Sequence, residues 1–289
     1  MKNNEFKAAF KKELPFFMMA PALIWQVLFF YFPIAIIIVL SLYKCGAIPA
    51  NISFANYRVL ATSSHILIIL RSLLFAFINA CVCLLFAYPV SYFLARKIKK
   101  LKNFMVFFLI LPFWINIVVQ IYSWYFVLER NGMINWVLLK LGIISQPLHL
   151  LNTMPSILLV MMYCYLPFMI MPLYSILEKI DERLIESSFD LGANSWQTFF
   201  KVTLPLSWPG IKTGFFLVFV PSFGEFIIPA LVGGSKNMFV GSLISHYFLT
   251  AHDVNVGAAF TIVSGLLLLF MAFCINWYFG RKTIVSKGQ

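Results

Sequence analysis

The sequence is poor in charge. Only 11% of its 289 residues are Asp, Glu, Lys or Arg, and just ten of these are acidic. Soluble domains carry about 25% charged and about 45–50% apolar residues, whereas 62% of this chain is hydrophobic. This composition excludes an ordinary soluble globular core, and we expect an all-α polytopic membrane protein.

Signatures of catalysis and of metal binding are also missing. The five cysteines form no C-x-x-C pair, and the four histidines show no spacing typical of metal ligands. A P-loop needs G-x-x-x-x-G-K-[ST], and the nearest stretch, Gly210-Ile211-Lys212-Thr213, lacks it. We therefore expect no catalytic residue, no metal site and no cofactor bound by this chain.

Six apolar runs are long enough to cross a hydrocarbon core of about 30 Å. They lie at residues 16–43, 66–95, 104–127, 154–178, 209–232 and 256–279. An even number of spans places both termini on one side of the membrane. The chain then has an N-terminal segment at 1–15, a six-span transmembrane domain at 16–280, a large loop at 179–208 and a tail at 281–289.

The distribution of basic residues orients these spans. Of the 22 lysines and arginines, 16 lie at the termini or in the segments on the same side as the termini. Because cytoplasmic loops carry an excess of Lys and Arg, both termini and the 179–208 loop are predicted to be cytoplasmic. The net charge of +12 is thus explained by topology and not by nucleic-acid binding.

One polar segment, residues 181–205, interrupts the apolar C-terminal half. Good or neutral helix formers run to Leu191, and Gly192 suits the left-handed position that ends a helix. Asn194 with Gln197 is typical of a capping box at the start of a second helix, and Pro205 is expected to end that helix. The pattern predicts a helix–turn–helix that docks into a groove of another protein.

The same segment resembles the "EAA" loop of ABC importer permeases, E-A-A-x3-G-x9-I-x-L-P. The matching positions are Glu186, Ser187, Ser188, Gly192, Val202, Leu204 and Pro205. Serines replace both alanines and valine replaces isoleucine, while the spacing is kept. The resemblance implies that the loop couples the chain to an ATPase subunit, with Glu186 orienting or pairing in the joint, Gly192 making its turn and Pro205 closing it.

Further stretches resemble the first permease subunit of bacterial spermidine/putrescine ABC importers. They are LPFWIN (111–116), NGMIN (131–135), YLPFMIMPLYSILEKID (165–181) and FVPSFGEFIIPALVGG (219–234). The resemblance implies a type I ABC importer permease fold in the bacterial inner membrane. It also implies three kinds of partner: a cytoplasmic ATPase dimer that uses ATP and Mg²⁺, a second homologous permease and a periplasmic polyamine-binding protein.

Glu225 is the candidate substrate-path residue that the sequence singles out most clearly. Counted along a helix from Lys212, it lies roughly 20 Å into the membrane, where a carboxylate is costly and usually faces a cavity or a partner. Pro221, Gly224 and Pro229 are expected to break the helix around it. The carboxylate either lines the passage and attracts a polycation, or is structural, capping a re-entrant turn or bonding the second permease.

The third span offers further candidates. Asn116, Gln120 and Trp124 are spaced four apart, and Ser123 lies on the same side. Such a polar stripe either lines the path or bonds neighbouring helices, as amides in membrane helices commonly do.

Two other functions stay open. A type I ABC permease for another solute, such as ferric ion or an anion, shares the EAA loop. A self-sufficient secondary transporter needs several intramembrane ionisable groups, and here only Glu225 is placed deep.

Overall fold

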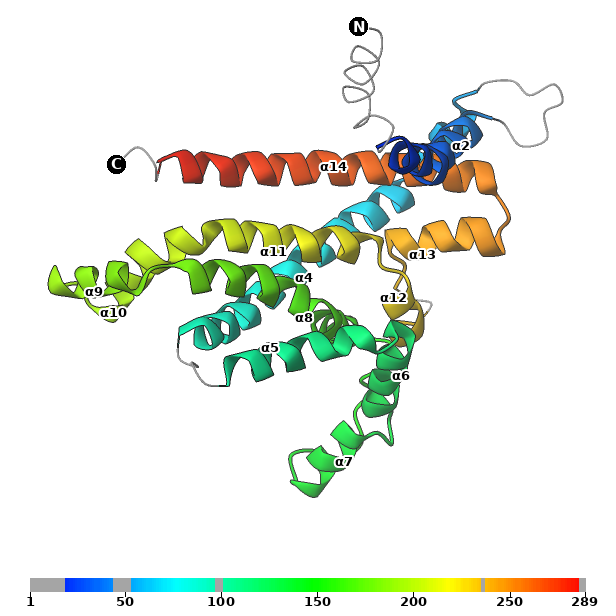
Figure 1. Ribbon diagram of the computed structural model, residues 1–289. Coiled ribbons are helices and arrows are strands. Elements are labelled where there is room, and N and C mark those ends of the chain that lie inside the picture. The colour runs from blue at the N-terminus through cyan, green and yellow to red at the C-terminus, as the bar shows by residue number, and fades with distance from the viewer. Residues whose placement is uncertain (1–18, 44–52, 97–100, 235–236, 286–289) are drawn as a thin grey trace, which may run out of the picture. The chain divides into compact units, whose positions relative to one another are not determined.

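The computed structural model describes residues 19–43, 53–96, 101–234 and 237–285. The predicted N-terminal segment at 1–15, the start of the first span and the end of the tail lie outside the described residues. The described part consists of helices joined by turns, without a β-strand among its residues (Figure 1). The predicted all-α fold is confirmed.

The chain divides into two compact units, which are described separately. The smaller one comprises Met1–Thr62 with Tyr247–Val263, and the larger one comprises Ser63–His246 with Ser264–Gln289. The division falls within the last helix, α14 (Val254–Val285), whose first turns belong to the smaller unit.

In the smaller unit, a 24-residue apolar helix runs from Met19 to Leu42. It contains a π-helical turn, η1 (Val27–Tyr31), followed by α2 (Phe32–Leu42). The end of α2 is fixed to α3 (Ala55–Leu60) by buried Asn56, whose Nδ2 donates to the carbonyl oxygens of Ser41 and Tyr43, both at 2.8 Å. The unit also contains the π-helical turn η4 (His246–Thr250), in which the ring of Tyr247 packs 6.3 Å from that of Phe260.

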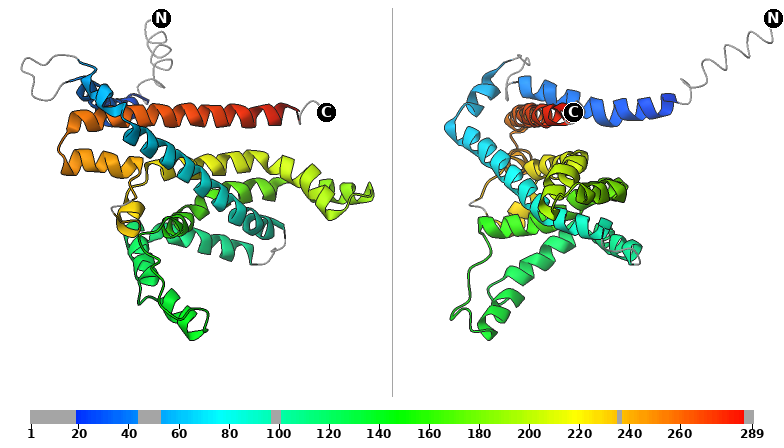
Figure 2. Two further views of the ribbon diagram at one scale, coloured as in Figure 1. Left: turned by 180° about the vertical axis from the view of Figure 1, so that it is seen from behind. Right: turned by 90° about the vertical axis from the view of Figure 1, so that its left-hand side faces the viewer.

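Three long helices form the centre of the larger unit. They are α4 (Ser63–Arg96), α8 (Met154–Lys179) and α11 (Leu204–Gly224), and each packs against the other two (Figures 1 and 2). Small residues allow this close packing: a Cβ added at Gly214 of α11 would lie 2.7 Å from Sδ of Met169 in α8. Buried polar pairs add to it, as in the 2.9 Å bond from Asn79 Nδ2 to Ser222 Oγ.

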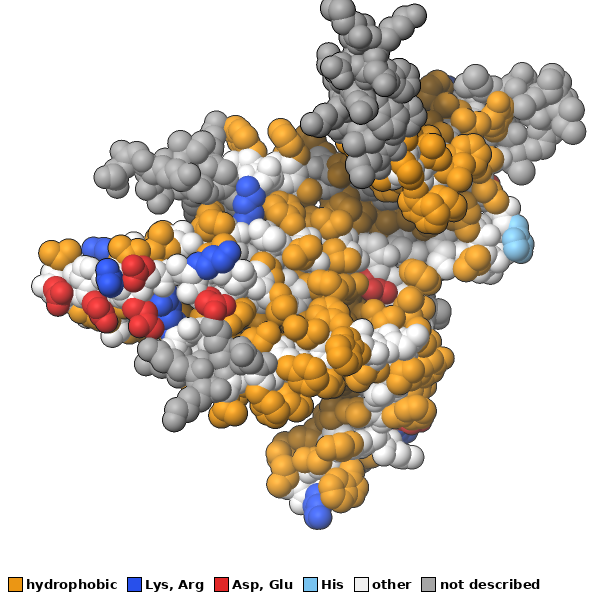
Figure 3. Space-filling view, in the orientation of Figure 1, with side chains coloured by type: hydrophobic (Ala, Val, Ile, Leu, Met, Phe, Trp, Pro, Cys, Tyr) orange, Lys and Arg blue, Asp and Glu red, His pale blue; other side chains and the backbone are white. Residues whose placement is uncertain are grey.

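The outward faces of these helices are apolar as well. Leu74 and Leu85 on α4 are 61% and 69% exposed, and hydrophobic side chains dominate the visible face of the molecule (Figure 3). A soluble protein rarely exposes so much contiguous apolar surface. In the described part of the chain, five helices have the length and composition of membrane spans, and a bent helix pair brings the count to six.

The bent pair corrects the predicted third span at 104–127. The first part consists of helix α5 (Lys102–Ile110) and the 3₁₀ turn η2 (Leu111–Trp114), and it ends at Trp114. The chain continues as α6 (Ile117–Leu128) and α7 (Met133–Lys140), at an angle of 94° to the first part. Pro112 removes a backbone donor at the break, and Asn116 caps the new helix by accepting from the N–H of Val118 at 2.8 Å. The apolar run hid this break because it is as hydrophobic as a continuous span.

The bounds of the predicted fifth span at 209–232 are corrected, while the break expected around Glu225 is present. A continuous helix covers Ser195–Gly224, and a separate short helix, α12 (Ile227–Val232), follows Glu225. Pro221 lies inside α11 and does not interrupt it. The break falls at Glu225 itself, whose backbone is extended (ψ 130°), and α12 is followed by α13 (Val240–Ser245).

Candidate functional site

The polar segment after α8 folds as the predicted helix–turn–helix. Helix α9 (Glu182–Asp190) begins at Asp181, whose Oδ1 accepts from the N–H of Arg183 at 3.0 Å. It ends in a Schellman motif: the N–H of Gly192 donates to Phe189 O at 2.8 Å, and the N–H of Ala193 donates to Ser188 O at 3.0 Å. Gly192 has φ +82°, as the sequence predicted.

The second helix starts at the predicted capping box. Asn194 Oδ1 accepts from the N–H of Gln197 at 2.9 Å, and Gln197 Oε1 accepts from the N–H of Asn194 at 3.0 Å. This cap opens α10 (Ser195–Thr198). Buried Ser188 and Thr198 then join the two helices through a 2.8 Å bond between their hydroxyl groups. The serine that stands for an alanine of the EAA pattern therefore fixes the angle between the helices.

The prediction that Pro205 ends the second helix is wrong. Helix α10 passes through a π-helical turn, η3 (Phe199–Thr203), directly into α11. The N–H of Leu204 donates back to Phe199 O in the wider turn. Because a π turn re-spaces the backbone hydrogen bonds, the missing N–H of Pro205 is accommodated within the first turn of α11. The proposed docking segment, residues 181–205, thus continues into a long central helix without a break in the helical backbone after Ser195.

Apolar side chains project from this otherwise polar end of the molecule. Leu191 is 88% exposed and Trp196 is 73% exposed, and Trp196 stacks on Phe200 with ring centroids 6.0 Å apart. Charged side chains gather around them, over α9 and α10 (Figure 3). Exposed aromatic residues inside a polar rim are typical of a protein interface, so this surface is suited to binding a partner.

Behind the surface lies a mixed polar pocket of about 330 Å³. Arg96, the last residue of α4, donates from Nη2 to the carbonyl oxygen of Ile180 at 2.8 Å. Its Nε is buried and has no hydrogen-bond partner among the described residues. Glu182 and Glu186 also line the pocket. Arg96 therefore connects α4 to the junction between α8 and α9, a role the sequence analysis missed because it counted this residue only as a topology signal.

Glu225 occupies the break between α11 and α12. Its Oε1 accepts from the backbone N–H groups of Phe226 at 3.0 Å, Ile227 at 2.9 Å and Ile228 at 3.4 Å. Its Oε2 accepts from the Tyr165 hydroxyl at 2.5 Å. The carboxylate thus supplies acceptors to the first turn of α12, and it is only partly buried.

The polar residues predicted to form a stripe on the third span each contact groups close to them in the structure. Gln120 Nε2 donates to the carbonyl oxygens of Pro112 and Ile115 at 2.5 and 3.0 Å, so it satisfies the backbone freed by the break. Ser123 Oγ donates to Val119 O at 2.9 Å, and the ring of Trp124 packs 5.3 Å from that of Tyr163 in α8. Helix α6 packs against α12. The fold therefore brings the stripe and the Glu225 break into the same region, although the stripe is used mainly to stabilise its own bend.

Tyr165 is a site residue that sequence reasoning did not single out. It lies in α8, 60 residues from its carboxylate partner, and is buried. A buried tyrosine hydroxyl usually finds a hydrogen-bond partner, which is the only signal the sequence carried. The partner itself depends on the packing of α8 beside the end of α11.

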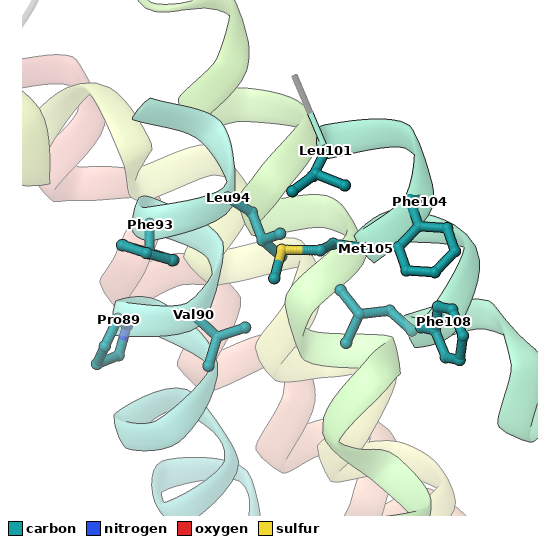
Figure 4. Close-up of a pocket in the computed structure, with 9 residues that line it drawn as sticks. Pro89, Val90, Phe93, Leu94, Leu101, Phe104, Met105 and Phe108 are labelled. Carbon is teal, nitrogen blue, oxygen red and sulfur yellow. The ribbon is translucent and has the colours of Figure 1, made fainter. Parts of the chain in front are cut away.

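A second pocket, of about 730 Å³, has a different character. It lies between α4 and α5 and is lined by Pro89, Val90, Phe93, Leu94, Leu101, Phe104, Met105, Phe108 and Leu109 (Figure 4). With only apolar side chains it offers no partner for a charged or polar solute. No group of three or more potential metal ligands occurs in the described part of the chain.

Long apolar helices, with a polar helix–turn–helix that exposes aromatic side chains at one end, are typical of a membrane-embedded subunit of a larger assembly. Residues 87–284 match the family described as binding-protein-dependent transport system inner membrane component, and the chain belongs to this family. It is an inner-membrane permease of the ABC importer type.

Several relatives carry a more specific description. The chain is 38% identical over 252 residues to the spermidine/putrescine transport system permease protein PotB of Escherichia coli K12, covering 85% of this chain and 92% of the relative. The PotB protein of Salmonella typhimurium LT2 is also 38% identical, with 85% and 88% covered. That of Haemophilus influenzae is 36% identical over 270 residues, with 92% and 93% covered.

Solved structures confirm the fold. The structure of a bacterial alginate ABC transporter in complex with an alginate pentasaccharide-bound periplasmic protein matches with a TM-score of 0.77. Identity is 18%, and the match covers 96% of this chain and 97% of that one. The predicted type I permease fold is thereby confirmed.

Proposed function

We propose that the chain is a transmembrane permease subunit of an ATP-driven importer of polyamines, spermidine or putrescine. The observation that carries this proposal is the 36–38% identity, over most of the chain, to permeases described as spermidine/putrescine transport proteins. Relatives that share this much sequence commonly share the solute-lining helices as well as the fold.

The chain itself hydrolyses no ATP in this proposal. A separate cytoplasmic ATPase dimer, using ATP and Mg²⁺, receives α9 and α10 in a groove. Leu191, Trp196 and Phe200 supply the apolar contacts. Glu186 lines the pocket that also contains Arg96. Because α10 is continuous with α11, closure of the ATPase pair would move α11 as a rigid body and alternate access between the two sides.

The other partners follow from the same assembly. A second homologous permease completes the passage, and a periplasmic polyamine-binding protein delivers the solute. One structural relative is complexed with a periplasmic protein, which supports this arrangement. Because α9 and α10 face the cytoplasmic ATPase, the 179–208 loop is cytoplasmic. In a six-span chain both termini lie on the same side as this loop, so they too are in the cytoplasm.

Glu225 is the proposed contact for the polycation. The helix from Ser195 to Gly224 has 30 residues and is roughly 45 Å long. Glu225 comes directly after it, so it lies near the end of the passage opposite the docking surface. There its carboxyl group lies at the helix break before α12, against which α6 packs. The stripe residues Asn116, Gln120, Ser123 and Trp124 would line the same region, chiefly by holding its shape.

A permease for an anion is the competing function. A probable sulfate transport system permease protein of Chlorella vulgaris is 35% identical, over 42% of this chain. The polyamine relatives match twice that share of the chain, and a carboxylate at the break suits a cation better than sulfate.

Uptake of labelled spermidine and putrescine, with and without this gene, tests the proposal. Unlabelled polyamines, an unrelated cation and sulfate serve as competitors. We expect gene-dependent uptake that only polyamines inhibit. Gene-dependent uptake of sulfate, with polyamine uptake unchanged, would replace the polyamine assignment and leave the permease role intact.

A further inference from the structure

The hairpin of α6 and α7 lies at the end of the bundle opposite the docking surface. Helix α8 starts after this hairpin and ends just before α9, and its 26 residues separate the two by about 39 Å. Both views show α6 and α7 leaving the bundle of α4, α8 and α11 (Figures 1 and 2).

The preceding segment is too short to cross a bilayer alone. Helix α5 and η2 together cover 13 residues from Lys102 to Trp114, or roughly 20 Å, against a hydrocarbon core of about 30 Å. The chain then turns by 94°. If α5 runs along the membrane normal with the bundle, α6 and α7 run close to the membrane plane, and the length of α8 places them toward its outer side.

One face of α7 is apolar and uncovered. Met133 and Trp136 are 68% and 59% exposed and lie three residues apart on one side of the short helix, and Leu141, which directly follows the helix, is 68% exposed. Lys140 lies on the same side, with Nζ 4.7 Å from the centre of the Trp136 ring. Trp with a neighbouring Lys is typical of the boundary between headgroups and acyl chains, where the ring is half embedded and the amine reaches the phosphates.

The opposite face of α7 is fixed to its own hairpin. Asn135 is buried, and its Nδ2 donates to the carbonyl oxygens of Arg130 at 3.1 Å and Leu148 at 2.9 Å. Its Oδ1 accepts from the N–H of Leu148 at 2.9 Å. These bonds orient the helix without help from any other protein, so its apolar face is presented permanently and not only when a partner arrives.

We infer that α7 is an interfacial helix resting on the outer leaflet of the bilayer, with phospholipid as its partner. Met133, Trp136 and Leu141 enter the headgroup–acyl boundary, and Lys140 and Arg130 contact lipid phosphates, to which their charge is complementary. A permanently exposed apolar face suits lipid, which is always present, better than a soluble protein that binds and leaves. The helix thereby braces the α5–α6 bend against the membrane surface.

Nitroxide labels on the assembled complex in lipid nanodiscs test this inference. Leu141→Cys and Met133→Cys are made in a chain whose native cysteines are replaced and which still imports solute. Collision with oxygen, which concentrates in lipid, is compared with collision with a water-soluble nickel chelate. We expect at least a threefold preference for oxygen at both sites.

Gln146→Cys, in the exposed loop after α7, is the matched control and should prefer the nickel chelate. Two outcomes would overturn the inference: nickel access at Leu141 equal to that at Gln146, or no access to either reagent, which would mean a protein covers the face. A further measurement adds the periplasmic partner. If Leu141 is accessible to nickel without this partner and loses that access when it is added, the face binds a soluble protein and not lipid. The result is independent of which solute is imported, so it stands or falls separately from the proposed function.

Discussion

The hydroxyl of Tyr165 donates a 2.5 Å hydrogen bond to Oε2 of Glu225. This contact joins α8, the helix that leads into the docking surface, to the break between α11 and α12. The other carboxylate oxygen is held by three backbone N–H groups of α12. One side chain thus connects two central helices and the short helix α12, at the end of the bundle far from α9 and α10.

Glu225→Gln tests whether the charge is used for the solute. The amide oxygen can still accept from α12, so the break should persist, while the negative charge is lost. We expect polyamine uptake to fall by about tenfold, the equivalent of roughly 1.4 kcal/mol, with copurification of the ATPase unchanged.

Tyr165→Phe is the matched control for that change, because it removes the hydrogen bond and keeps the carboxylate. Uptake by this variant should fall less than uptake by Glu225→Gln. Normal uptake by Glu225→Gln in an intact complex would show that the carboxylate is structural only.

Gly192→Ala should weaken coupling. The left-handed backbone at Gly192, φ +82°, disfavours any residue with a Cβ by about 1–2 kcal/mol, which distorts the turn between α9 and α10. Gly142 offers a control, since it has φ +70° and equally open surroundings but lies outside the docking segment. We expect substrate-stimulated ATPase activity to drop in Gly192→Ala and to be retained in Gly142→Ala; equal losses would contradict a specific role of the turn.

Arg96 should position the docking segment. Arg96→Ala removes the bond to Ile180 O and leaves a cavity beside Glu186. Without this bond the α8–α9 junction is no longer held to α4. We therefore expect coupling to loosen, so that more ATP is hydrolysed for each solute molecule imported. Arg96→Lys keeps a donor and should recover part of the coupling ratio, whereas an unchanged ratio in Arg96→Ala would exclude the role.

Leu191 and Trp196 should contribute most of the apolar docking surface. Trp196→Ser removes a large exposed ring, and burial of such side chains is worth about 1.5–3 kcal/mol each. We expect the ATPase to dissociate during purification of this variant. Ile143→Ser, a similarly exposed site at the other end of the bundle, is the control and should keep the ATPase bound.

The sequence predicted the helix–turn–helix at 181–205 well because its signals are local. The glycine at 192 and the pair Asn194–Gln197 act on neighbouring backbone groups, and the structure shows the expected turn and capping box. The π turn before Pro205 has no such signature, and the continuation into α11 was therefore missed.

The breaks within the membrane were harder to predict. Hydrophobicity shows that a segment avoids water, but not whether it runs straight, so the span at 104–127 appeared continuous. The break around Glu225 was expected from Pro221, Gly224 and Pro229, but its exact place was not. Gln120 was recognised as polar, yet its partners are backbone groups exposed by the break itself. For Glu225, capping of a turn was one of the two roles considered, and its Oε1 accepts from backbone N–H groups at the start of α12. Tyr165 and Arg96 owe their roles to packing between distant segments, which one sequence does not reveal.

The central claim is ATP-driven import of a polyamine through this chain. Its most direct test uses proteoliposomes that contain the complete complex, the periplasmic binding protein and ATP on the ATPase side, with labelled spermidine on the other side. We predict accumulation that requires ATP, the binding protein and this subunit together, and that putrescine or unlabelled spermidine competes away. Accumulation without ATP, or none with any polyamine by a complex that hydrolyses ATP normally, would contradict the account.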